Sequence, residues 1–162
     1  MNSHEPPDRP APAHRRPPDA GDAAVAAVGK LSEALETTER ARGHLYTFHQ
    51  LTGGADAQLD AAVELLREAG HDALAQQVAT ELIGRNVLPG RWTFQIVEEY
   101  DDDYYAAFRA MERRARDQLL AGRRHVYEAE MKEDRRTHGH DAHRATPGGA
   151  SPAEGEVPDD GR

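Results

Sequence analysis

Residues 92–108 read WTFQIVEEYDDDYYAAF and hold six of the nine aromatic residues in this chain of 162 residues. Aromatic side chains bury the most apolar surface per residue, so this stretch is expected to be the energetic centre of the fold. Its apolar residues recur every three or four positions, which is the period of an amphipathic helix. The predicted apolar stripe consists of Val97, Tyr100, Tyr104, Phe108, Met111, Ala115 and Leu119.

The first residues of this stretch allow a second interpretation. Arg91 to Ile96 alternate apolar and polar residues, which is the period of a strand. No other segment alternates comparably, so a strand here would need a partner outside the chain, such as a copy across a two-fold axis. We expect the first turns of a helix, with an extended segment as the alternative. The helical segment then continues to about Arg136, and Gly122 is a candidate break.

The helical period also covers the residues before this stretch. Apolar residues from Val25 to Leu51 predict a first helix, which Thr52-Gly53-Gly54 is expected to end. Asp56 and Asp72 are candidate N-caps of two further helices, and Gly70 is a candidate left-handed residue between them. Because short connections make successive helices antiparallel, the sequence predicts an all-α fold, an antiparallel bundle of four or five helices.

Proline placement divides the chain into three parts. Nine of the ten prolines lie in residues 1–18 and 147–158, whereas 32 of the 34 large apolar residues lie in residues 22–137. A segment without apolar residues cannot offset the entropy lost on ordering. We therefore predict a helical bundle domain over 22–137, a disordered proline-rich tail over 1–21 and a disordered Gly/Pro/acidic tail over 138–162.

Composition excludes several classes of protein. Cysteine is absent, which excludes disulfides, thiol nucleophiles and thiolate metal sites. No apolar run approaches the roughly 18 residues that span a membrane, and residues 1–21 lack the apolar centre of a signal peptide. We expect a soluble, cytoplasmic protein without membrane contacts. No glycine-rich phosphate loop occurs either.

Charge is unevenly distributed along the predicted long helix. Five carboxylates lie within Glu98–Asp103, and six arginines lie within Arg109–Arg124. Asp102 and Arg116 are roughly 20 Å apart along a straight helix, too far to neutralise each other. An antiparallel second copy would place the acidic cluster of one chain beside the arginines of the other, and such complementarity fixes the register of an association.

An oligomerising or partner-binding module is therefore the first functional hypothesis, with a homodimer favoured over another protein partner. It uses the aromatic and acidic helix near residues 91–136. Its candidate partner-binding residues are Trp92, Tyr100, Asp101, Asp102, Asp103, Tyr104, Arg113 and Arg116. Nucleic acid is not the expected partner of these arginines, because the formal net charge is −9 and the carboxylates lie a few turns upstream.

A metal-dependent helical-bundle enzyme is the alternative hypothesis. His44 or His49 could bind a divalent metal with Glu98 and Asp102 from a facing helix. The acid pairs Glu36-x-x-Glu39 and Glu98-x-x-Asp101 resemble those of the MazG-type nucleotide pyrophosphohydrolases, which implies magnesium, although the two pairs are much farther apart here. Glu68-x-x-His71 is similar to the motif of ferritin-like di-iron bundles, which need two such motifs and two further glutamates. Whether the chain is an enzyme stays open.

Overall fold

The computed structural model describes residues 8–146, and every regular element in that range is helical. The predicted all-α class is confirmed. Helix α3 begins at Thr93, so the residues after Trp92 are helical, as expected. The extended alternative is not found there, and just before the helix lies an isolated bridge between Leu88 and Arg91. The elements are η1 (Pro12–His14), α1 (Asp22–Glu68), α2 (Asp72–Glu81), α3 (Thr93–Glu99), η2 (Tyr100–Tyr105), α4 (Ala106–Leu120), α5 (Val126–Arg135) and η3 (Asp141–His143).

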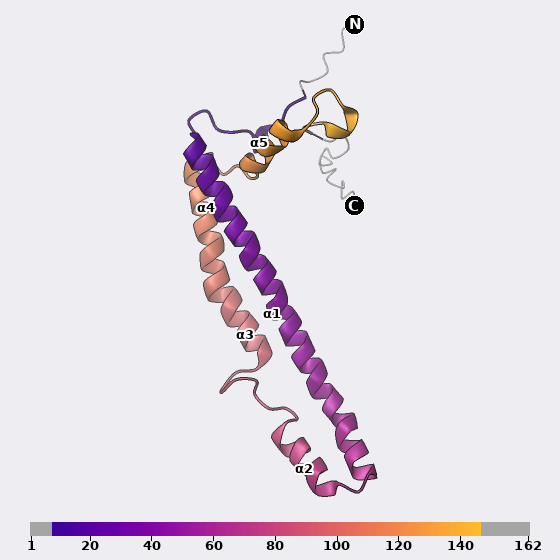
Figure 1. Ribbon diagram of the computed structural model, residues 1–162. Coiled ribbons are helices and arrows are strands. Elements are labelled where there is room, and N and C mark those ends of the chain that lie inside the picture. The colour runs from indigo at the N-terminus through magenta and orange to yellow at the C-terminus, as the bar shows by residue number, and fades with distance from the viewer. Residues whose placement is uncertain (1–7, 147–162) are drawn as a thin grey trace, which may run out of the picture. The chain divides into compact units, whose positions relative to one another are not determined.

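Helix α1 is one uninterrupted helix of 47 residues, as Figure 1 shows. The break expected at Thr52-Gly53-Gly54 is therefore wrong. Two glycines disfavour a helix by about 1 kcal/mol each, but tertiary packing on both sides outweighs that preference. Asp56 does not begin a helix; it lies inside α1, and its Oδ1 accepts a hydrogen bond from the Gly84 N–H at 2.9 Å. Gly70 follows α1 with φ +80°, as expected.

The turn between α1 and α2 differs from prediction by one residue. His71 is the N-cap of α2, and its side chain makes no capping bond, while Asp72 is the first helical residue. A carboxylate in the first turn stabilises a helix through its dipole, so Asp72 helps this helix begin without capping it.

The chain divides into two compact units, of which unit 2 is Leu31–Glu112. There α1 runs antiparallel to α3, η2 and the start of α4 (Figure 1). Side-chain hydrogen bonds join the two arms of this hairpin in strict antiparallel order. They link His49 to Thr93 (2.7 Å), Arg42 to Asp101 (2.5 Å), Glu39 to Tyr105 (3.0 Å) and Ser32 to Glu112 (3.1 Å).

One face of α1 forms the inner seam of unit 2. Its buried and half-buried residues alternate in steps of three and four, which is the heptad spacing of a coiled coil. Both ends of the seam are mainly apolar and its middle is polar. The seam consists of Leu31, Leu35, Thr38, Arg42, Leu45, His49, Thr52, Asp56, Leu59, Val63 and Leu66.

The second arm meets this seam with a face rotated by one residue from the predicted stripe. Tyr104 and Met111 are each 55% exposed, and Leu119 is exposed too. The residues that follow each of them, Tyr105, Glu112 and Leu120, are half-buried or buried. The cause is η2, a π-helical turn that accommodates one additional residue and so shifts the inward face after it toward the following residues. The predicted inward stripe is wrong at Tyr104, Met111 and Leu119, whereas Phe108 and Ala115 are half-buried as expected.

Unit 1 comprises Met1–Lys30 and Arg113–Arg162, of which residues 8–30 and 113–146 are described. Its core consists of Val25, Val28, Leu120 and Val126. The predicted break at Gly122 is confirmed, because α4 ends at Leu120 and both following residues have positive φ.

Parts of both predicted tails make specific contacts in unit 1. Arg16 donates two hydrogen bonds of 2.7 Å to the Glu130 carboxylate. The Arg136 side chain is only 3% exposed and binds the carboxylates of Asp8 and Glu133. Residues 8–21 and 138–146 thus have a described conformation, whereas 1–7 and 147–162 of the predicted tails lie outside the described residues.

Gly53→Ala and Gly54→Ala should each raise the free energy of unfolding by about 1 kcal/mol, because alanine favours a helix. An added Cβ meets no atom within 4 Å at either position. Thermal unfolding followed by circular dichroism measures the change. Gly29→Ala is the matched control, since its Cβ would lie 2.9 Å from Cγ of Tyr127 and must displace that ring. Lower stability in the first two variants would contradict an uninterrupted α1.

Candidate functional site

The centre of the inner seam is an ion pair between Arg42 of α1 and Asp101 of η2. Arg42 Nε and Nη2 donate to the two carboxylate oxygens at 2.5 and 2.7 Å. The guanidinium also lies over two aromatic rings, 4.8 Å from the centroid of Tyr46 and 5.0 Å from that of Tyr105. The two hydrogen bonds fix the direction of the Arg42 guanidinium, and the two rings fix its position along the hairpin axis.

This environment sets the charges of the groups around Arg42. The hydrogen bonds from Arg42 hold the pKa of Asp101 below its usual value of 3.8, against the opposing effect of burial. Burial, followed by the hydrogen bond to Glu39, raises the pKa of Tyr105. Asp101 is therefore ionised and Tyr105 neutral at pH 7. Both groups hold the two arms together, and neither is poised to transfer a proton near pH 7.

The four residues of the predicted metal site do not converge. His49 Nδ1 lies 2.7 Å from Thr93 Oγ1 inside the seam. His44, Glu98 and Asp102 are exposed. Within residues 8–146, no three His, Asp or Glu side chains form a group that could hold a metal ion.

The predicted partner-binding residues fall into two groups. Asp101 is occupied by Arg42, and Arg116 is buried in unit 1, where its Nη1 donates to the Gly122 carbonyl at 2.9 Å. These two residues act within the fold. The rest of the set is open to solvent: Trp92, Asp102, Asp103, Tyr104 and Arg113 are exposed, and Tyr100 is half-buried.

A second face of α1 carries no charged residue over nine turns of helix. Like the inner seam, it follows steps of three and four, and nearly all of its residues are exposed. Leu51 is 69% exposed. The signal for this face in the sequence is alanine or phenylalanine at every seventh residue from Ala34. The face consists of Ala34, Thr37, Ala41, His44, Phe48, Leu51, Ala55, Gln58, Ala62 and Leu65.

The second arm has a matching apolar row. Tyr100, Tyr104 and Phe108 form a chain of ring contacts, with centroids 5.5 and 6.0 Å apart. Ile96 precedes them and Met111 follows them at helical spacing. The first pair is tilted and the second is edge-to-face. These contacts order the rings, of which Tyr104 is exposed and Tyr100 and Phe108 are half-buried.

Both rows lie on the same side of the hairpin. The side chains of Ser32, Glu39 and Tyr46 contact the second arm from one flank of the α1 seam. At 100° per residue, Ala34, Ala41 and Phe48 occupy the other flank. On the second arm, Tyr105 and Glu112 mark the first flank, so the row from Ile96 to Met111 lies on the second. We call this combined surface, which is mainly apolar but includes Thr37, His44 and Gln58, the outer face.

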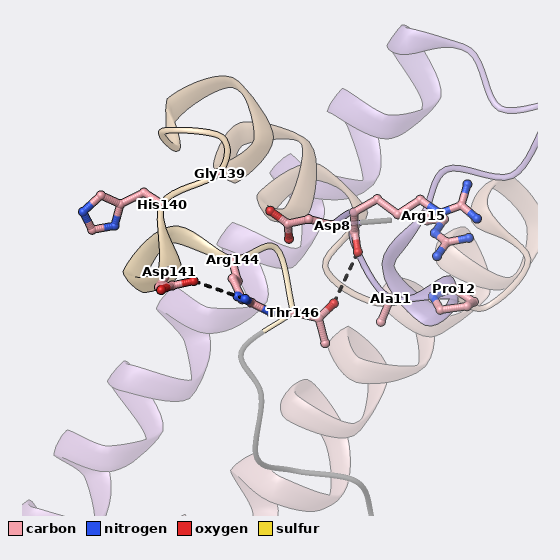
Figure 2. Close-up of a pocket in the computed structure, with 10 residues that line it drawn as sticks. Asp8, Ala11, Pro12, Arg15, Gly139, His140, Asp141, Arg144 and Thr146 are labelled. Carbon is pink, nitrogen blue, oxygen red and sulfur yellow. Dashed lines mark hydrogen bonds and ion pairs between the residues drawn. The ribbon is translucent and has the colours of Figure 1, made fainter. Parts of the chain in front are cut away.

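Unit 1 contains a pocket of about 770 Å³ between the N-terminal segment and residues 139–146 (Figure 2). Asp8 and Asp141 on its walls are ion-paired with Arg136 and Arg144. Arg15 donates from Nε to the Pro10 carbonyl at 2.6 Å. The Asp8–Arg136 ion pair joins the N-terminal segment to the end of α5, and Thr146 Oγ1 donates to the Arg9 carbonyl at 3.3 Å. The residues around the pocket therefore hold the two segments together.

Asp101→Asn should lower the free energy of unfolding by about 1–2 kcal/mol at pH 7, because it weakens a charge-assisted bidentate pair. The pKa of Asp101 is lower in the folded chain than in the unfolded chain. Its contribution is therefore present above pH 3.8 and is lost as the pH falls through the folded value. Urea unfolding between pH 3 and 7 should show the gap between wild type and variant closing on acidification.

Asp102→Asn is the matched control for this experiment, because its carboxylate is exposed and adjacent in sequence. It should unfold like the wild type over the same pH range. An equal effect of the two substitutions would mean that the cluster acts through its total charge and not through the Arg42 pair.

Comparison of the chain with known protein families, curated proteins and solved structures gives no match on which a function could be based. The chain matches no protein-family model, no curated protein and no solved structure. What the chain does is therefore inferred from its own residues and contacts.

Proposed function

We propose that this chain is an oligomerising or partner-binding module that associates through the outer face of unit 2, first of all with itself. The observation that carries the proposal is the exposure of large apolar side chains on a hairpin of only two arms. Amphipathic helices become stable by covering their apolar faces with another layer. Unit 2 covers one face of each arm internally and leaves a second apolar face on both.

The distribution of charge supports the same function. The outer face of α1 carries no charge between Ala34 and Leu65, and the facing row of the second arm carries none between Tyr100 and Met111 apart from the exposed aspartates at its edge. Contiguous apolar surface with charges at its border is typical of protein interfaces. Tyr and Met are also among the residues enriched there.

No helix within residues 8–146 combines the length and apolarity needed to cross a lipid bilayer. Metal chemistry has no support from the geometry either, because His44, His49, Glu98 and Asp102 lie apart. The association module is therefore the function that these contacts favour.

Leu51→Gln combined with Met111→Gln should shift the purified chain from oligomer to monomer, because both side chains are exposed in unit 2 and apolar contact drives association. Sedimentation velocity over a hundredfold concentration range measures the mass. Leu88→Gln is the control: it removes an apolar group of similar exposure in the connection before α3. Asp101 must stay intact, since its loss would disturb the hairpin itself. A wild-type chain that stays monomeric throughout would overturn self-association.

A further inference from the structure

The outer face divides its large and small side chains between the two arms. On α1, the part that lies beside the second arm carries Ala34, Thr37 and Ala41. The position of a residue along the axis of the hairpin is called its height. The second arm carries Tyr104, Phe108 and Met111 at the corresponding height, because Glu39 contacts Tyr105 and Ser32 contacts Glu112. The surface therefore has a row of recesses beside a row of projections.

Resting on the proposed self-association, we propose that two copies pack outer face to outer face about a two-fold axis that runs parallel to the hairpin. This rotation keeps every residue at its own height and exchanges the two arms. The projecting row of one copy then covers the small residues of the other: Tyr104 meets the partner's Ala41, Phe108 the partner's Thr37, and Met111 the partner's Ala34. Large against small gives even layer spacing and close packing.

The result is a four-helix arrangement in which every neighbouring pair of helices is antiparallel. On α1 the inner seam and the outer face are separated by about 110°, close to the right angle between the two neighbours of a helix in a square bundle. A two-fold axis across the hairpin would instead stack α1 on α1 and aromatic row on aromatic row, which opposes small to small and large to large.

Charges at the rim fit the same arrangement. Arg40 borders the outer face on α1, and Asp103 borders it on the second arm. Arg42–Asp101 and Glu39–Tyr105 place these two residues at the same height. The lengthwise axis therefore brings Arg40 of one chain beside the partner's Asp103, and both side chains are exposed. Asp102 lies on the opposite flank, beyond the reach of this contact.

The available surface is sufficient for a dimer of modest affinity. Residues 34–51 extend about 26 Å along α1, and two helices side by side are about 20 Å wide. Each copy can therefore contribute on the order of 500 Å², or about 1,000 Å² in total, near the lower limit for a specific interface. Modest affinity makes the dimer concentration-dependent and sensitive to rim charges.

A cross-linking experiment tests the axis directly, because the chain has no cysteine of its own. Thr37→Cys and Ala107→Cys introduce single thiols at small, exposed positions of similar height on opposite arms. Under mild oxidation, a mixture of the two variants should form a covalent dimer on a non-reducing gel, and either variant alone should not. Cross-linking of Thr37→Cys alone would overturn the lengthwise axis in favour of α1 stacked on α1.

A charge exchange provides a second, independent test. Arg40→Asp and Asp103→Arg should each raise the dissociation constant about fivefold in sedimentation experiments at low salt. Their combination should restore the wild-type value, whereas Asp102→Arg, the matched control, should leave it unchanged. Failure of the combination to restore association would overturn the rim contact. A chain that dimerises but fails both tests would refute this arrangement and leave the proposed function standing; a monomer would refute both.

Discussion

The Arg42–Asp101 pair is the contact on which the rest of unit 2 depends. It places a charged residue in the middle of a seam whose ends are mainly apolar, so only one alignment of the two arms satisfies it. A polar group inside a helical seam specifies register in this way, at some expense of stability. The bonds at Thr93, Tyr105 and Glu112 follow from the same alignment, and so does the height of every residue on the outer face.

The polar seam also explains why so much apolar surface is exposed. Arg42, His49 and Asp56 occupy positions that apolar residues hold in most helical hairpins, and they require polar partners on the facing arm or connection. Those partners occupy the inward positions and leave the aromatic row outside. Unit 1 is organised differently: a small aliphatic core is closed by arginines that hold segments distant in sequence, such as Arg136 with Asp8.

Helical class, the approximate start of α3 and the break near Gly122 were predictable because each depends on local residue preferences. The continuity of α1 through Gly53 and Gly54 was not, because it depends on contacts such as Asp56 with Gly84 that lie 28 residues apart. The stripe from Tyr104 onward was predicted with the period of a regular α-helix, and a π-turn is invisible to that period. The acidic cluster is visible in the sequence, but which of its aspartates faces α1 depends on that same turn.

The three consecutive aspartates in η2 make the length of this turn as consequential as its composition. Loss of any one of them would leave an acidic cluster nearly unchanged in charge while removing the residue that widens the turn. Because the lost residue is the additional one, the shortened arm would continue as a regular α-helix with Glu112 still facing α1. Closing the turn at its full length would instead rotate the downstream arm by about 100° and bring Met111 to face α1. The inner and outer surfaces of this arm therefore depend on the match between the number of residues in the turn and its hydrogen-bond pattern.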